Sequence, residues 1–104
     1  MYHDYDFDQP KIYDDAAREA IDLGNRLADK DEEADVWDIA DGLVAGAIQY
    51  WLYARQPCGD PDCENCEPVN TAEKRFAELL RYTKELVTES EYYHSPNDIN
   101  AGNA

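Results

Sequence analysis

Three cysteines lie close together in the stretch PCGDPDCENCEP, between Pro57 and Pro68. Their spacing, Cys58-x4-Cys63-x2-Cys66, contains one CxxC pair, which lets two thiolates face the same tetrahedral metal ion. The chemistry that this pattern indicates is therefore zinc binding. A closed structural zinc site needs four ligands, and the chain has only three cysteines. The candidates for the fourth ligand are His3, Asp60, Asp62 and His94.

Two other states of the cysteines stay open on the sequence alone. A disulfide within the loop would pin it, or the thiols could remain reduced and structural. Because carboxylates surround them, we expect the pKa of these thiols to be raised, which argues against a reactive thiolate. The connector is about 13 residues long, which is long for a link between packed helices, so some staple is expected.

Apolar residues recurring every three or four positions predict three helices around this loop. The first is expected from about Asp15 to Asp29, the second from about Glu32 to Gln56, and the third from the start at Asn70 to about Tyr92. The residues expected to cap them are Asp14, Asp31 and Asn70.

The second helix is apolar over most of its circumference, so we expect it to be central and buried. Its Gly42 and Gly46 form a GxxxG pattern, which predicts close approach of a neighbouring helix. The expected fold is all-α: a three-helix, bundle-like single domain with the Cys-rich loop between helices 2 and 3. Residues 1–13 would form an aromatic and acidic arm, 14–93 the helical domain and 94–104 a flexible tail.

The net charge of −15 on 104 residues is the second feature that bears on function. It argues against direct binding to nucleic acid or to an anionic membrane, because phosphates would be repelled. It favours a basic protein or nucleoprotein partner, reached by electrostatic steering. Two helical rows carry the acids expected to contact such a partner: Asp15, Glu19 and Asp22 in the first helix, and Asp31, Asp35 and Asp38 around the start of the second.

Aromatic side chains at the end of the second helix exceed what one small core needs. Tyr50, Trp51 and Tyr53 are expected to supply an apolar anchor at an interface, either with a partner or in a homodimer.

Signatures of catalysis and of membrane insertion are missing from the sequence. It contains no glycine-rich phosphate loop, no HExxH and no nucleophile elbow, so we expect no enzyme and assign no catalytic residue. The N-terminus lacks the pattern of a signal peptide, and the longest apolar stretch, Gly42–Ala54, is too short to cross a bilayer. We therefore expect a cytoplasmic protein.

In size, charge and acidic rows the chain resembles the phage-encoded DNA mimics that act as anti-restriction and anti-CRISPR inhibitors. The resemblance rests on these general properties and on no sequence motif. It implies a non-enzymatic inhibitor that occupies a basic nucleic-acid-binding surface of its partner, in the host cytoplasm. The alternative is a small structural or interaction module stapled by zinc or by a disulfide.

Overall fold

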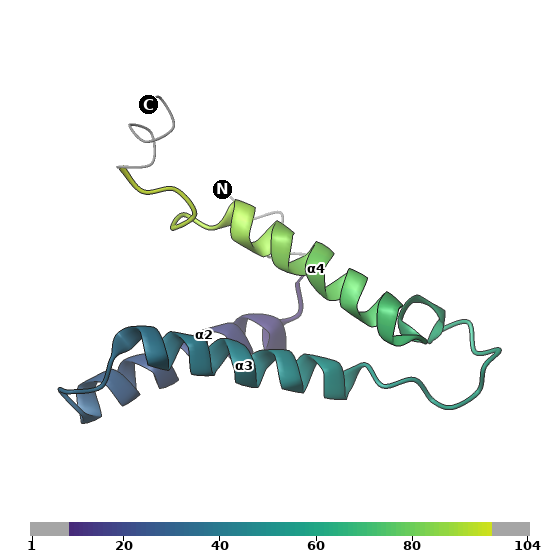
Figure 1. Ribbon diagram of the computed structural model, residues 1–104, viewed down its shortest axis with the longest axis horizontal. Coiled ribbons are helices and arrows are strands. Elements are labelled where there is room, and N and C mark those ends of the chain that lie inside the picture. Colours follow the sequence, from purple (N-terminus) through teal and green to yellow (C-terminus); the bar gives the residue numbers. More distant parts are fainter. Residues whose placement is uncertain (1–8, 97–104) are drawn as a thin grey trace. The chain divides into compact units, whose positions relative to one another are not determined.

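The computed structural model describes residues 9–96 and divides the chain into two units, Met1–Trp51 and Leu52–Ala104 (Figure 1). All regular elements in the described part are helical: α2 (Lys11–Lys30), α3 (Val36–Ala54), the short 3-10 helix η1 (Glu67–Val69) and α4 (Ala72–Glu89). The predicted all-α fold with three helices, and with the cysteines between the second and third, is confirmed. Within residues 9–96, no helix is both long and apolar enough to cross a membrane.

Helix α2 begins four residues earlier than the sequence predicts. Pro10 occupies the N-cap position in an extended conformation, and the Tyr13 N–H donates to its carbonyl at 3.0 Å. The predicted cap Asp14 is wrong, because that residue lies within the first helical turn. Residues 9–13 are thus the entry into α2, whereas the rest of the predicted arm, 1–8, and the tail residues 97–104 lie outside the described residues.

Helix α3 begins at Val36, because Asp35 and not Asp31 caps it. The Asp35 carboxylate accepts the Trp37 N–H at 2.9 Å, and the Asp35 carbonyl accepts the Ile39 N–H at 3.1 Å. Asp31 makes a similar contact one turn earlier, with the Glu33 N–H at 3.0 Å, but there it closes the turn between the helices. The predicted start at Glu32 is therefore wrong.

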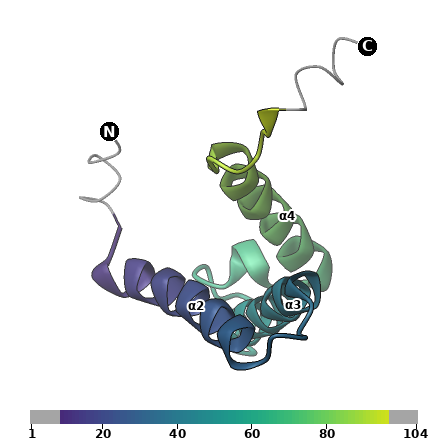
Figure 2. The ribbon, with the colours of Figure 1, turned by 90° about the vertical axis from the view of Figure 1, so that its left-hand side faces the viewer.

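The close approach between α2 and α3 occurs at Gly24 of α2. A Cβ atom at Gly24 would lie 3.0 Å from Leu43 Cδ1 and 4.0 Å from Ile39 Cγ2. Figure 2 shows α2 turning back into α3 through the 31–35 connection. The prediction for the GxxxG pattern is wrong, because a Cβ atom at Gly42 or Gly46 would meet nothing within 4 Å.

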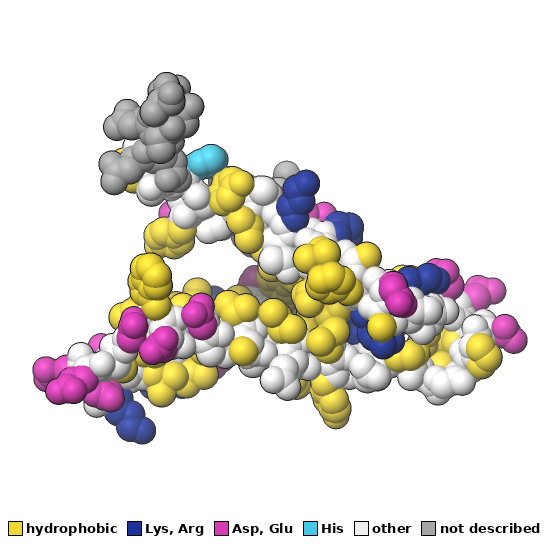
Figure 3. Space-filling model, in the orientation of Figure 1, with side chains coloured by type: hydrophobic (Ala, Val, Ile, Leu, Met, Phe, Trp, Pro, Cys, Tyr) yellow, Lys and Arg dark blue, Asp and Glu magenta, His cyan; other side chains and the backbone are white. Residues whose placement is uncertain are grey.

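No side chain among the described residues is fully buried, so α3 is not the buried helix that its composition predicts. Ile39 and Leu43, which face Gly24, are only half-buried. Trp37, by contrast, is 80% exposed. Figure 3 shows apolar side chains across the visible surface. The apolar surface of α3 is wider than the contact that the small residues of α2 make with it.

Helix α4 is capped by Thr71, one residue after the predicted cap. The Thr71 hydroxyl accepts the Lys74 N–H at 3.1 Å, and the Thr71 carbonyl accepts the Arg75 N–H at 2.9 Å. Asn70 Oδ1 is shielded from solvent and accepts no hydrogen bond. Asn70 is therefore not the cap, and α4 ends at Glu89, before the predicted Tyr92.

These two neighbours should respond differently to alanine. Thr71→Ala removes the cap and is expected to lower the free energy of unfolding by about 1 kcal/mol. Asn70→Ala removes an unsatisfied acceptor and is expected to cost less, because no hydrogen bond is lost. Urea unfolding followed by circular dichroism measures both. A larger loss in Asn70→Ala than in Thr71→Ala would contradict the assignment of the cap.

Candidate metal centre

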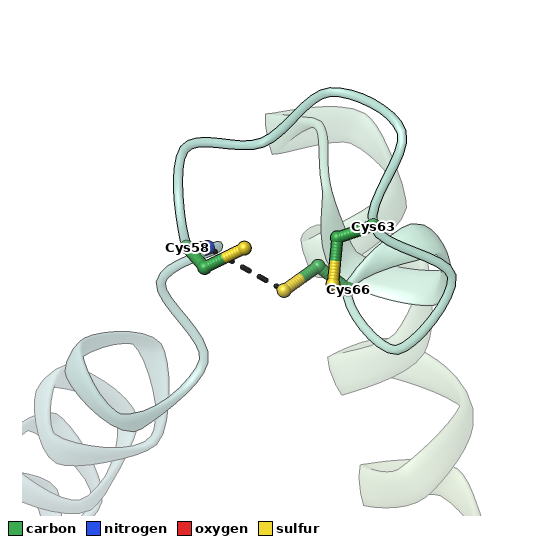
Figure 4. Close-up of side chains that lie close together, drawn as sticks. All are labelled: Cys58, Cys63 and Cys66. Atoms are coloured by element: carbon green, nitrogen blue, oxygen red, sulfur yellow. Dashed lines mark hydrogen bonds between the residues drawn. The ribbon is translucent and has the colours of Figure 1, made fainter.

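The three cysteine side chains converge on one point of the connector between α3 and α4 (Figure 4). All three are free thiols. Their Sγ atoms lie within 4.8 Å of one another, at about 3.7 Å. Cys63 and Cys66 are half-buried and Cys58 is exposed. The spacing seen in the sequence therefore produces a cluster of three sulfurs.

The sulfur triangle has the size that zinc requires. Zinc–sulfur bonds of about 2.3 Å at tetrahedral angles place two sulfurs about 3.8 Å apart. The separation of about 3.7 Å between the Sγ atoms matches this edge. A disulfide needs sulfurs about 2.05 Å apart, so no two of these cysteines are disulfide-bonded, and the three sulfurs could share one ion.

Turns in the first half of the loop bring Cys63 back towards Cys58. Gly59 has φ +95°, a backbone conformation that side chains disfavour. The Asp60 carboxylate accepts the Asp62 N–H at 2.9 Å, and the Asp60 carbonyl accepts the Cys63 N–H at 3.1 Å. This local turn explains how a stretch with four carboxylates and no cation folds back on itself.

The second half of the loop is fastened to the start of α4. The Cys66 carbonyl accepts the Val69 N–H at 2.9 Å and so opens η1. Lys74 Nζ lies 2.6 Å from Glu67 Oε2 and 3.1 Å from the Glu67 carbonyl oxygen. Arg75, which is half-buried, donates to the Val69 carbonyl at 3.0 Å. Both cations of the first turn of α4 therefore hold the segment that follows Cys66.

Backbone amides point at the sulfurs. The Cys58 N–H donates to Cys66 Sγ at 3.4 Å (Figure 4). The Cys66 N–H lowers the pKa of the Cys63 thiol, because hydrogen bonding favours the thiolate, and the Cys66 and Cys58 thiols act in the same direction. The expectation that acidic neighbours raise the pKa is therefore wrong for Cys63.

The pKa of the Cys66 thiol is raised, as expected, although the carboxylates are not the cause. The Cys58 N–H acts to lower this pKa, but hydrogen bonds with the Cys63 and Cys58 thiols and partial removal from water outweigh it. The three thiols thus share hydrogen bonds with one another.

No fourth ligand joins the cluster from residues 9–96. Of the four candidates from the sequence, Asp60 and Asp62 are exposed and outside the cluster. His94 lies beyond the far end of α4, whose 18 residues rise about 27 Å, and its ring contacts Tyr93 at 4.6 Å between centroids. His3 falls outside the described residues.

The predicted acidic residues are used in different ways. Asp15 is paired with Lys11 at 2.7 Å and with Arg18 at 3.3 Å. Asp35 and Asp31 hold backbone N–H groups, as described for the α3 cap and the turn before it. Glu19, Asp22 and Asp38 are exposed. The two predicted rows therefore differ in how many carboxylates remain available to a partner.

The predicted aromatic anchors lie at the end of α3. Tyr50 is 71% exposed and Tyr53 is 73% exposed, whereas Trp51 is half-buried. The sequence did not single out Gly59, Lys74 or Arg75 as parts of the cysteine loop. A glycine directly after a cysteine is the one local signal that could have indicated the turn.

No protein-family model, curated protein or solved structure matches this chain.

Gly59→Ala tests whether the turn after Cys58 positions the sulfurs. A side chain at φ +95° costs about 1–3 kcal/mol, so the affinity for added zinc is expected to fall by about 5- to 150-fold. Gly42→Ala is the matched control, because its Cβ would meet nothing and it lies in a helix. Competition with a colorimetric zinc chelator measures both affinities. Equal affinities in the two variants would show that the turn is not needed.

Proposed function

We propose that this chain is a non-enzymatic binding module whose Cys58, Cys63 and Cys66 thiolates hold one Zn²⁺. The observation that carries the proposal is the convergence of the three Sγ atoms within 4.8 Å of one another. The ion would close the loop between residues 58 and 66 and so fix the connector next to the start of α4. Because structural zinc sites contribute folding energy, such a clip suits a chain without a buried core in residues 9–96.

Further support comes from the groups around the sulfurs. An N–H donor reaches Cys66 Sγ, and the Cys66 N–H favours the thiolate of Cys63. Metal-bound thiolates carry negative charge, and N–H groups stabilise it. Lys74 and Arg75 hold the segment that follows Cys66, so this ligand starts from fixed backbone.

The metal content of the purified chain tests this proposal. Protein prepared without chelator, under reducing conditions, is expected to contain about one zinc per chain. The Cys58→Ser/Cys63→Ser/Cys66→Ser variant is the control and is expected to contain almost none. A ratio near zero for the unmodified chain, both as purified and after incubation with zinc and desalting, would rule out the proposal.

A second candidate function is that of an acidic inhibitor, of the phage anti-CRISPR or anti-restriction type, which covers a basic nucleic-acid-binding surface of its partner. The observation in its favour is that Glu19 and Asp22 of α2 are exposed and make no ion pair within the described residues. Acidic side chains also gather over the turn between α2 and α3 (Figure 3). Tyr50 and Tyr53 would supply the apolar contacts, in a partner complex or a homodimer.

Paired charge reversals test the acidic candidate. Glu19→Lys/Asp22→Lys and the control Glu89→Lys/Glu91→Lys change the net charge equally, and all four side chains are exposed. In pull-downs from bacterial lysate at physiological salt, the first variant is expected to lose nucleic-acid-binding proteins that DNA displaces from the unmodified chain. Equal capture by both variants would contradict a specific acidic surface.

A further inference from the structure

The cysteine cluster supplies three donors to its metal ion, and the described residues supply no other. Neither Asp60, Asp62 nor His94 has an oxygen or nitrogen within the group formed by the sulfurs. The Asp60 carboxylate already accepts the Asp62 N–H within the turn. A tetrahedral zinc ion bound here would therefore have one position left for a ligand from outside residues 9–96.

The cluster lies where such a ligand can reach it. Cys58 is exposed, and so is every residue of the turn that follows it, from Gly59 to Asp62. Cys63 and Cys66 are only half-buried. A side chain from another molecule would thus approach the ion without any rearrangement of a helix.

Charge selects the kind of ligand. Three thiolates on one Zn²⁺ already give the site a net charge of about −1. The loop adds the carboxylates of Asp60, Asp62, Glu64 and Glu67, and among residues 9–96 a cation pairs with Glu67 alone. A fourth anionic ligand, whether thiolate or carboxylate, would be repelled by this charge. A neutral imidazole carries no such penalty, and it is a common zinc ligand.

We propose that the fourth position of the metal is open and accepts a neutral imidazole, so that the loop recognises a histidine side chain of a partner. This inference rests on the proposed three-thiolate zinc site. The histidine would belong to a different protein, since this chain has only His3 and His94, and the variants described below test both. The ion would then act both as a clip for the loop and as the contact point with the partner.

Cobalt-substituted protein tests the inference with free imidazole as the probe. Co²⁺ bound by thiolates gives a charge-transfer band, and its visible bands report the number and type of ligands. Adding imidazole to the reduced, cobalt-loaded full-length chain is expected to shift the visible bands and to saturate at one imidazole per cobalt. Acetate at the same concentration is the anionic control and is expected to leave the visible bands unchanged.

Each result of this titration has one meaning. A charge-transfer band without any response to imidazole would overturn the inference but leave the three-thiolate site standing. Loss of that band on adding imidazole, which indicates removal of the cobalt, would also overturn it. Absence of the band before any addition would refute the proposed metal site itself.

Two variants show whether the chain fills the position with its own histidine. His3→Asn and His94→Asn are each expected to respond to imidazole like the unmodified chain. A response that appears only in one of the variants would overturn the inference, because that histidine, from the same chain or from a second copy, would be the fourth ligand.

Discussion

Replacing Cys63 with serine is expected to weaken zinc binding by more than about 100-fold. Removal of an outer-shell partner alone typically costs 10- to 100-fold in metal affinity, and Cys63 would be a direct ligand. The pKa of the Cys63 thiol is lowered, whereas that of the Cys66 thiol is raised. Of these two ligands, Cys63 therefore forms its thiolate more readily. The loss should also remove any rise in thermal stability on addition of zinc, because binding energy is folding energy in such sites.

Competition with a zinc-binding dye measures this change, with circular dichroism as the readout of stability. His94→Asn is the control, since His94 lies outside the cluster, and its zinc affinity is expected to be unchanged. If Cys63→Ser binds zinc as tightly as the unmodified chain, the ion does not sit on the three sulfurs.

The second large effect is that of pH on zinc affinity. Zinc affinity is expected to fall by about 100- to 1,000-fold between pH 7 and pH 6. Each protonated thiol must lose its proton when zinc binds, so each contributes about tenfold per pH unit. The pKa of Cys66 is raised, so its proton must be displaced throughout this range. The pKa of Cys63 is lowered, so its thiolate persists to lower pH and competes less with protons.

The direction of the pH effect follows from these protonation states. Affinity, and the stability that zinc adds, is greatest at high pH and is lost as the pH falls. Zinc titrations in a series of buffers, with free zinc set by a chelator of known pH dependence, give the number of protons released. Release of two to three protons per zinc is expected. A release near zero would indicate carboxylate ligands, which are already ionised at these pH values.

The sequence predicted the helices well and their ends poorly. Apolar residues recurring every three or four positions placed all three helices, although α3 is apolar over most of its circumference. The caps were misjudged where two good capping residues compete. Asp31 and Asp35 both accept an N–H two residues on, yet only Asp35 starts α3. Asn70 and Thr71 are adjacent, and the hydroxyl of Thr71 makes the bond.

The sequence did not predict how far the side chains of α3 are buried. The broad apolar surface of α3 predicted a central helix, but periodicity does not show which neighbour covers a face. The approach at Gly24 is set by Leu43 and Ile39 of α3, which no pattern in α2 alone reveals. Because α2 covers only part of the apolar surface of α3, Trp37 and Tyr50 of α3 are exposed.

The sequence predicted the ligands of the candidate site but not the contacts that hold the loop in place. The CxxC spacing and a third cysteine indicated a shared ion, and the sulfurs do converge. The fastening of the loop by Lys74 and Arg75 depends on side chains of α4 that reach back over several residues. No local sequence rule describes such contacts, nor does one show that residues 9–96 supply no fourth ligand.

X-ray absorption at the zinc edge tests the central claim most directly. For the zinc-loaded chain at neutral pH, three sulfur atoms at about 2.3 Å and one nitrogen or oxygen at about 2.0–2.1 Å are expected around each ion. That result would place Cys58, Cys63 and Cys66 on one metal. A first shell of nitrogen and oxygen alone, with no sulfur, would contradict the account.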